Sequence, residues 1–294
     1  MKVYLVSAFT HQGRGGNGAG VVLCEGFPGN NQMQEIAKAI GFSETVFVCP
    51  GEDVYTSKFF TPQCEVPLCG HATIAAFHLM GYLGYIRGNE GTVTATQETG
   101  AGRLPVCIEF VRGRPGRVFM EQSKPSRLGA LDREDLKELC ICLGLELADL
   151  GIENSANTLP EIISTGLPDI IVPVLTKNIL DGINPEFERL AGLSRRLGVV
   201  GAHVFTMQTE NPEFTVRCRN FGPAVGINEE AATGTSNGAL GYYLYKRGML
   251  TAGGMACEQG FGMGKPSAIY VRAGQEGVWV GGEAAITGER DINL

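Results

Sequence analysis

The chain has 294 residues, of which 44% are apolar and 42 are glycine, which is enough for one large domain or two medium ones. Its formal charge of -7 is spread along the chain without a basic block, and this argues against nucleic acid as a partner. The nine cysteines are odd in number and irregularly spaced, the N-terminus lacks a signal-peptide pattern, and no stretch reaches the about 18 apolar residues of a membrane span. We therefore expect a cytoplasmic protein without disulfides and without membrane contact.

The first half of the chain predicts strands that alternate with two helices. After a glycine-rich turn around Asn17, apolar residues with helical spacing begin at Met33 and end at Gly41, a natural helix terminator. Strands are predicted over residues 43–48 and 57–60. An apolar helix then opens at Gly70 and continues to Leu79.

The second half predicts the same order of elements. A polar connection at residues 125–134 contains a new helix start at Asp132, and we place a lobe boundary there. Asn184 is predicted to be an N-cap with Pro185 in the first helical position, and this helix ends at Gly198. Strands follow over residues 202–206 and 214–218, and a further helix opens around Gly234.

This order indicates an internal repeat. Phe47 matches Phe205, Phe60 matches Phe221 and Gly70 matches Gly234, at a nearly constant offset along the chain. We therefore predict an α+β fold of two pseudo-symmetric lobes, each a mixed sheet or barrel wrapped around a central helix. The first lobe comprises residues 1–124, to which residues 284–294 are expected to return, and the second comprises residues 125–283.

The glycine-bearing starts of the two apolar helices form a candidate anion site. A helix N-terminus offers unpaired N–H groups and the positive end of the helix dipole. If the lobes face each other, the turns at Gly70-His71 and Gly234-Thr235 converge on one cleft and can grip a carboxylate. The alternative is that both glycines only permit tight turns.

Glu44 is the most informative single residue. In a strand its side chain shares a face with Val46 and Val48, where an unpaired carboxylate is unfavourable unless it is protonated, paired or in use. Burial raises the pKa of a carboxyl towards the range of a neutral-pH acid/base catalyst. Its repeat counterpart is Ala202, so the strand does not require the acid. The alternative is a strand-end glutamate that faces solvent.

Three further residues are candidates near the predicted cleft. His71 could bond substrate or relay a proton, or it could simply cap or pack the helix. Glu230 precedes the second helix, where acids often only complement the helix dipole. Asn17 is a turn residue first and a ligand contact second.

Two other motifs are rejected. The grouping of Cys64, Cys69, His71 and His78 fits no standard zinc spacing, and we predict no metal. Residues 260–264, with sequence GFGMG, lack the spacing and the strand–helix context of a dinucleotide-binding loop.

Four segments together resemble the phenazine-biosynthesis (PhzF-like) family. They are residues 41–47 (GFSETVF), 59–73 (FFTPQCEVPLCGHAT), 229–235 (EEAATGT) and 258–267 (EQGFGMGKPS), and they occur in matching order over essentially the whole chain. The resemblance implies a diaminopimelate-epimerase-like fold, a homodimer and no cofactor. In the family's best-known activity, the strand glutamate moves a proton within a dihydro-hydroxyanthranilate ring.

The resemblance implies a role for each candidate. Glu44 becomes the general acid/base of an isomerase acting on a small carboxylate-bearing substrate, with His71 and Glu230 as helpers. Asn17 becomes a substrate contact, and Gly70, Gly234 and Thr235 contribute the carboxylate cradle.

Two alternatives stay open beside this reading. The chain could be a non-catalytic small-acid binding or regulatory protein. It could also be an amino-acid epimerase or racemase, but the related two-cysteine enzymes carry a thiol at each helix start. Here Cys69 occupies the first such position, whereas Thr233 or Ala232 fills the second, which argues against the two-thiol route.

Overall fold

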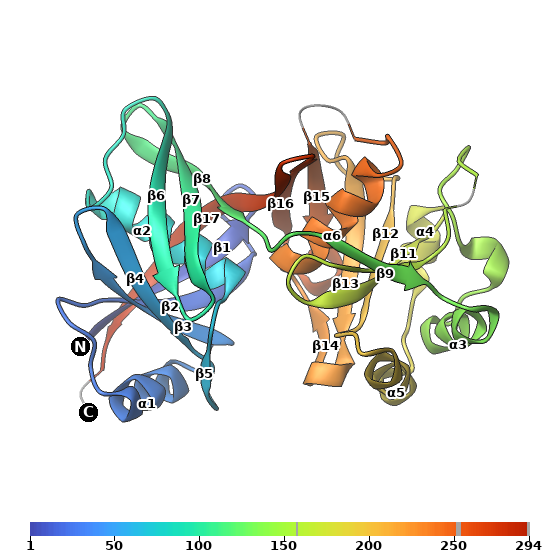
Figure 1. Cartoon of the computed structure of the whole chain (residues 1–294), viewed down its shortest axis with the longest axis horizontal. Helices are drawn as coiled ribbons and strands as arrows, with labels where there is room; N and C mark the ends of the chain where they lie inside the picture. The colour runs from blue at the N-terminus through green and yellow to red at the C-terminus, as the bar shows by residue number, and fades with distance from the viewer. Residues whose placement is uncertain (157, 251–253, 293–294) are drawn as a thin grey trace. The chain divides into compact units, whose positions relative to one another are not determined.

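The computed structural model describes residues 1–156, 158–250 and 254–292, and it divides into two compact units. Unit 1 comprises Met1–Glu121 together with Gly281–Leu294, and unit 2 comprises Gln122–Val280. Figure 1 labels their helices and strands. Both units combine strands with helices, and the predicted α+β class is confirmed.

Unit 1 consists mainly of strands. Its elements are β1 (Lys2–Thr10), β2 (Asn17–Leu23), α1 (Asn30–Ile40), β3 (Glu44–Pro50), β4 (Val54–Phe60), β5 (Glu65–Val66), α2 (Gly70–Leu83), β6 (Gly91–Thr99), β7 (Gly102–Val111), β8 (Arg114–Glu121) and the greater part of β17 (Gly277–Asp291). The latter part of β17 pairs antiparallel with β1, and Ala284 lies opposite Ala8.

Helix α2 is the central helix of unit 1. Ten of its residues, among them Ile74, Phe77 and Leu79, are buried, and the helix is apolar on nearly all sides. It packs against β1, β2, β3, β7 and β8, which surround it in Figure 1. A helix of this composition cannot face solvent, so the strands of unit 1 enclose it. Its N-terminus emerges where the site residues lie.

Unit 2 contains more helices than unit 1. Its elements are β9 (Ser126–Ala130), α3 (Arg133–Leu143), η1 (Leu147–Asp149), β10 (Glu161–Ser164), β11 (Pro168–Pro173), α4 (Lys177–Gly182), α5 (Phe187–Leu197), β12 (Ala202–Thr206), β13 (Val216–Gly222), η2 (Pro223–Val225), β14 (Ile227–Glu230), α6 (Gly234–Tyr245), β15 (Met255–Gln259), η3 (Phe261–Met263), β16 (Ser267–Gly274) and the start of β17. Helix α6 is its central helix and packs against β10, β11, β12 and β16.

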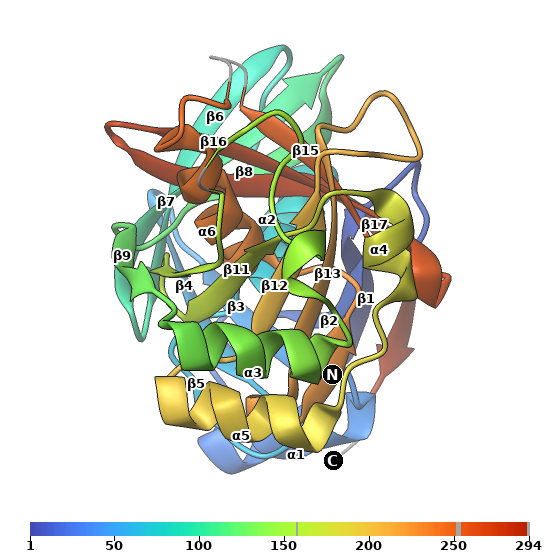
Figure 2. The ribbon, with the colours of Figure 1, turned by 90° about the vertical axis from the view of Figure 1, so that its right-hand side faces the viewer.

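Helices α3 and α5 lie side by side on unit 2, as Figure 2 shows. Arg189 of α5 donates two hydrogen bonds to Glu138 of α3, at 2.6 and 2.9 Å. Beneath them, apolar residues of both helices join a core cluster with Val172, Val204 and Phe221. Burial of this apolar face, more than the exposed ion pairs, holds the two helices in place.

The two units repeat one topology. In unit 1, β2 and β3 are parallel, β3 and β4 are antiparallel, and β4 and β6 are parallel. In unit 2, β11 and β12 are parallel, β12 and β13 are antiparallel, and β13 and β15 are parallel. A central helix follows the antiparallel pair in both units. The predicted repeat of elements is therefore present in the strand pairing.

The predicted ends of two helices are confirmed, and one helix start is wrong. Gly41 and Gly198 end α1 and α5 in the left-handed conformation, with φ of 74° and 68°. Helix α5, however, begins at Phe187 with Glu186 as its N-cap, and Asn184 does not cap it. The Glu186 N–H donates to the Cys142 carbonyl of α3, at 2.8 Å, and this tertiary bond holds Glu186 outside the helix.

One predicted strand is displaced. The strand expected over residues 214–218 begins at Val216 and continues to Gly222. Phe214 instead belongs to a turn, because its N–H donates to the Asn211 carbonyl at 3.1 Å.

Candidate active site

Glu44 and His71 meet at one end of unit 1. Glu44 is the first residue of β3 and lies opposite Ala19 of the parallel strand β2, whereas His71 lies in the first turn of α2. Glu44 Oε2 is 3.2 Å from His71 Nε2. The side chains are only 20% and 9% exposed, so bulk water screens this pair weakly. A strand and a helix that are separate in the sequence thus supply an acid–imidazole pair.

Two further side chains surround the imidazole ring. Ser43 Oγ is 3.4 Å from Nε2, and Cys69 Sγ is 3.4 Å from Nδ1. When Nε2 carries the proton it faces the Glu44 carboxylate, and when Glu44 is protonated its hydroxyl can face a bare Nε2. The two atoms are not aligned as a hydrogen bond in this arrangement, so a small rotation of either side chain is needed before they can share a proton.

The N-terminus of α2 is open for an acceptor. The N-cap residue Cys69 has an extended backbone and supplies no side-chain cap. The first intrahelical bond recorded at this end runs from the Thr73 N–H to the Cys69 carbonyl, so the preceding N–H groups have no partner within the helix. Together with the helix dipole, they form a suitable place for a carboxylate.

Gly70 is not required by the backbone of unit 1. Its φ is not among the positive values of the chain. Among the described atoms, a Cβ at this position would meet Met120 Sδ at 3.6 Å, an ordinary van der Waals contact. Neither strain nor crowding within the unit explains a glycine here. A glycine does, however, let another molecule approach the backbone closely.

The corresponding turn of unit 2 is organised by a buried amide. Gln259, at the end of β15, donates to the Glu230 carbonyl at 2.8 Å and to Thr233 Oγ1 at 3.2 Å. Its Oε1 accepts from Asn237 Nδ2 at 2.8 Å and from the Thr233 N–H at 3.3 Å. The Glu230 carboxylate accepts from Thr233 Oγ1 at 3.0 Å. Gln259 thus fixes Glu230 relative to the start of α6.

The same device occurs in unit 1. Thr73 of α2 donates to Gln97 Oε1 at 3.2 Å, and Gln97 Nε2 donates to Ser57 Oγ at 3.1 Å. Asn237 and Gln259 follow Thr73 and Gln97 at nearly the same offset as the other matched pairs of the repeat. Both glutamines are buried. In each unit, a buried glutamine therefore connects the central helix to the sheet. Gln97 does so from β6, which is parallel to β4, and Gln259 from β15, which is parallel to β13.

The predicted site residues fall into two groups, one in each unit. Asn17, the first residue of β2, lies two positions before the register partner of Glu44, so it joins Glu44, Gly70 and His71 at one end of unit 1. Glu230, Gly234 and Thr235 lie at the β14–α6 turn of unit 2. The Thr235 carbonyl accepts from Thr165 Oγ1 at 2.9 Å.

Sequence reasoning did not identify Ser43, Gln259 and Asn237. A signal for Gln259 existed, because it lies in one of the four family-like segments. Ser43 directly precedes Glu44 and carries no signal of its own. Asn237 shows no motif either, since its importance follows from a bond to Gln259 that only the fold creates.

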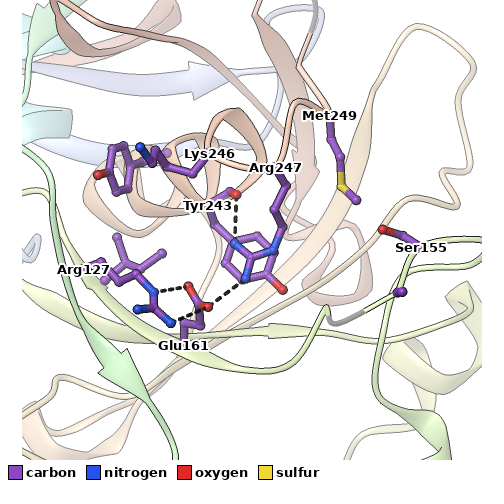
Figure 3. Close-up of a pocket in the computed structure, with 10 residues that line it drawn as sticks. Arg127, Ser155, Glu161, Tyr243, Lys246, Arg247 and Met249 are labelled. Atoms are coloured by element: carbon purple, nitrogen blue, oxygen red, sulfur yellow. Dashed lines mark hydrogen bonds and ion pairs between the residues drawn. The ribbon is translucent and has the colours of Figure 1, made fainter.

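A cavity of about 430 Å³ in unit 2 lies apart from the predicted residues (Figure 3). Its lining includes Glu161, which accepts from Arg127 at 2.9 and 3.0 Å and pairs with Arg247 at 2.8 Å. Burial alone would raise the pKa of Glu161, but the bonds from these two arginines outweigh it and lower the pKa below its ordinary value. The single carboxylate of Glu161 thus compensates one of the two arginine charges.

A second cavity, of about 250 Å³, is also in unit 2 and is lined in part by Arg217, Glu258 and Gln259. Glu258 is fully buried and pairs with Arg217 at 3.1 Å. The predicted catalytic and binding residues are absent from both sets of described lining residues. Within the described residues, no helix is long and apolar enough to cross a membrane.

Comparison with known proteins identifies the family. The family model described as phenazine biosynthesis-like protein matches residues 6–290. An uncharacterised isomerase of Deinococcus radiodurans is 36% identical over 97% of this chain and 92% of its own length. A Bacillus anthracis phenazine biosynthesis protein of the PhzF family is 27% identical, with a TM-score of 0.83 over 100% of this chain and 99% of its own.

A more distant structure shares the fold. A probable proline racemase of Agrobacterium radiobacter, at 14% identity, covers 100% of this chain and 93% of its own with a TM-score of 0.63. The predicted diaminopimelate-epimerase-like fold class is thereby confirmed. The chain belongs to the phenazine biosynthesis-like family, and it is an isomerase.

Proposed function

We propose that this isomerase works without a cofactor, by one-base proton transfer through Glu44 on a small substrate that carries a carboxylate. The observation that carries the proposal is the distance of 3.2 Å between Glu44 Oε2 and His71 Nε2 beside the open N-terminus of α2. A base must lie within reach of the proton that it takes, and a fixed carboxylate binding point sets that geometry.

The reaction needs two proton movements and no net exchange of atoms. The Glu44 carboxylate takes a proton from a substrate carbon next to an electron-withdrawing group, and the resulting acid returns a proton to another carbon on the same side of the substrate. His71 lies against the carboxylate and can share its proton with it as the charge changes. The N–H groups at the start of α2 bind the substrate carboxylate.

We extend the proposal to unit 2 and to assembly. We propose Glu230, Gly234 and Thr235 of unit 2 as substrate-contacting residues, because they form the repeat counterpart of the turn at Gly70. Gln259 supports this assignment, because it holds the Glu230 backbone and the start of α6 together. The family resemblance adds a homodimer, which sedimentation of the purified protein tests, and the cytoplasmic location expected from the composition stays part of the proposal.

The experiment is proton exchange into a panel of small cyclic, unsaturated and amino carboxylic acids in D₂O, followed by NMR. We expect Glu44→Gln, which preserves shape but removes the titratable group, to lower the exchange rate by about 10²–10⁴. Glu65→Gln, an exposed glutamate of β5, is the matched control and should exchange at the wild-type rate. Unchanged exchange in Glu44→Gln would show that Glu44 is not the base.

The binding-protein alternative gives a different result. It predicts that an acid of the panel binds in calorimetry, while no deuterium enters it even with the wild-type protein. Since Glu44→Gln leaves the N-terminus of α2 intact, ligand binding should survive this substitution under both readings. Exchange, rather than affinity, therefore separates the enzyme from the binding protein.

A further inference from the structure

Cys69 is a member of the site that the proposed proton transfer does not use. Its Sγ lies 3.4 Å from His71 Nδ1 and 3.9 Å from Nε2. The ligand atoms of Glu44, Cys69 and His71 all lie within 4.8 Å of one another. A carboxylate, a sulfur and an imidazole thus converge on one point of unit 1, from β3 and from the start of α2.

The spacing of these atoms fits a tetrahedral zinc ion. With zinc bonds of about 2.0 Å to nitrogen and oxygen and 2.3 Å to sulfur, ligand atoms in a tetrahedron lie about 3.3–3.5 Å apart. His71 Nε2, the nitrogen beside Glu44, lies 3.2 Å from Glu44 Oε2 and 3.9 Å from Cys69 Sγ, whereas the shorter sulfur distance of 3.4 Å is to Nδ1. For Nε2 to bind the ion together with Glu44, the sulfur has to move closer to that nitrogen than 3.9 Å.

A second observation supports a cation at this point. Glu44 Oε2 is buried, and although His71 Nε2 lies 3.2 Å away, no described residue donates to this oxygen with hydrogen-bond geometry. A buried carboxylate oxygen without a donor is unfavourable, and a metal ion would satisfy it. The N-terminus of α2 also favours negative charge on the side chains beside it, which suits anionic ligands.

We propose that Glu44, Cys69 and His71 bind one zinc ion, or a similar thiophilic divalent cation, with a fourth position left for water. Three protein ligands with an open position are a common zinc arrangement. The inhibitory consequence rests on the proposed function: a metal on Glu44 occupies the carboxylate that takes the proton, and it lowers turnover. Binding itself does not depend on that function.

Co²⁺ is the probe for binding, because a cobalt–thiolate bond gives a charge-transfer absorption band in the near ultraviolet. The full-length protein, freed of metal by chelation and kept reduced, is titrated with Co²⁺ and then with Zn²⁺. We expect one equivalent to bind with this band, and Zn²⁺ to displace Co²⁺ and abolish it. Cys69→Ser should lose the band and weaken Zn²⁺ binding at least tenfold.

Cys64→Ser is the matched control, because Cys64 is exposed and lies shortly before Cys69 in the chain. It should keep the band and the affinity. Glu44→Gln should keep the band but weaken Zn²⁺ binding, and it serves as the second variant if Cys69→Ser does not fold. A band that persists in Cys69→Ser, or the absence of a one-to-one complex in the wild type, would overturn the proposal.

The activity readout separates this proposal from the function on which it partly rests. Zn²⁺ should slow the D₂O exchange of the wild type and of Cys64→Ser, with less effect on Cys69→Ser. If Glu44 is not the base, the cobalt spectrum and its loss in Cys69→Ser remain as expected. If the metal site is wrong, the effect of Glu44→Gln on exchange remains while the spectrum fails.

Discussion

Replacement of Gln259 by leucine tests how the start of α6 is held. Leucine has a similar size but removes two hydrogen bonds of 2.8 Å to Glu230 and Asn237, two longer ones to Thr233, and a weak one of 3.7 Å from Cys218 Sγ that we leave out of the sum. With about 1 kcal/mol for each short bond and about 0.5 kcal/mol for each long one, the loss is about 3 kcal/mol. Gln259 is 1% exposed, so water cannot replace these partners.

The assay is urea unfolding followed by the fluorescence of Trp279, the single tryptophan, which lies in unit 2. Gln97→Leu is the matched control, because Gln97 holds the same position in unit 1 but makes two bonds, of 3.1 and 3.2 Å. It should cost about 1 kcal/mol, measured by circular dichroism. A loss of less than about 1 kcal/mol in Gln259→Leu would refute the argument, because it is less than two such bonds provide.

Two further predictions concern α2. Gly70→Ala should leave the free energy of unfolding nearly unchanged, because the added Cβ would only contact Met120 Sδ at 3.6 Å. It should raise the KM of D₂O exchange, because the Cβ crowds the proposed binding point of the substrate carboxylate. An unchanged KM would show that the carboxylate binds elsewhere. Burial lowers the pKa of His78 below its ordinary value of 6.5, against a smaller opposing effect of a Gly116 backbone bond. The unfolded chain then binds more protons below pH 6.5, so His78 removes stability as the pH falls, by at most about 1.4 kcal/mol per unit. Urea unfolding at pH 7.5 and 5.5 should show a smaller decrease for His78→Gln than for the wild type, and equal decreases would contradict this assignment.

The sequence predicted those features that local chemistry controls. Gly41 and Gly198 end helices because glycine adopts the left-handed conformation, and Asp132 caps α3 through bonds to the Glu134 and Asp135 N–H groups. The predicted start of α5 was wrong, and the contact at this point is non-local, because the Glu186 N–H donates to the Cys142 carbonyl of α3. Local signals could not reveal a bond between two helices that lie far apart in the sequence.

The prediction of no metal stays untested, and it rests on spacing rules alone. Spacing rules consider ligands that follow each other along the chain, and Cys64, Cys69, His71 and His78 do not match them. The fold separates this set: Cys64 is exposed and bonds with Thr61, whereas Cys69 and His71 lie beside Glu44 from another element. The third ligand of the proposed cluster comes from a strand well before Cys69 in the sequence, where no spacing rule would look.

The repeat itself favours a single base. Both units contain a buried glutamine that bonds to the central helix. Its partner is Thr73 in α2 and Asn237 in α6, so the contact is present in both units although the residue differs. The acid–imidazole pair is not kept, because Ala202 stands at the offset of Glu44 and Thr235 at that of His71. The two units thus share a topology, but only unit 1 carries the Glu44–His71 pair. This arrangement suits a reaction in which one residue takes the proton and the same residue returns it. A two-thiol racemase would instead need a cysteine at both helix starts, and here Thr233 or Ala232 stands where the second cysteine would lie.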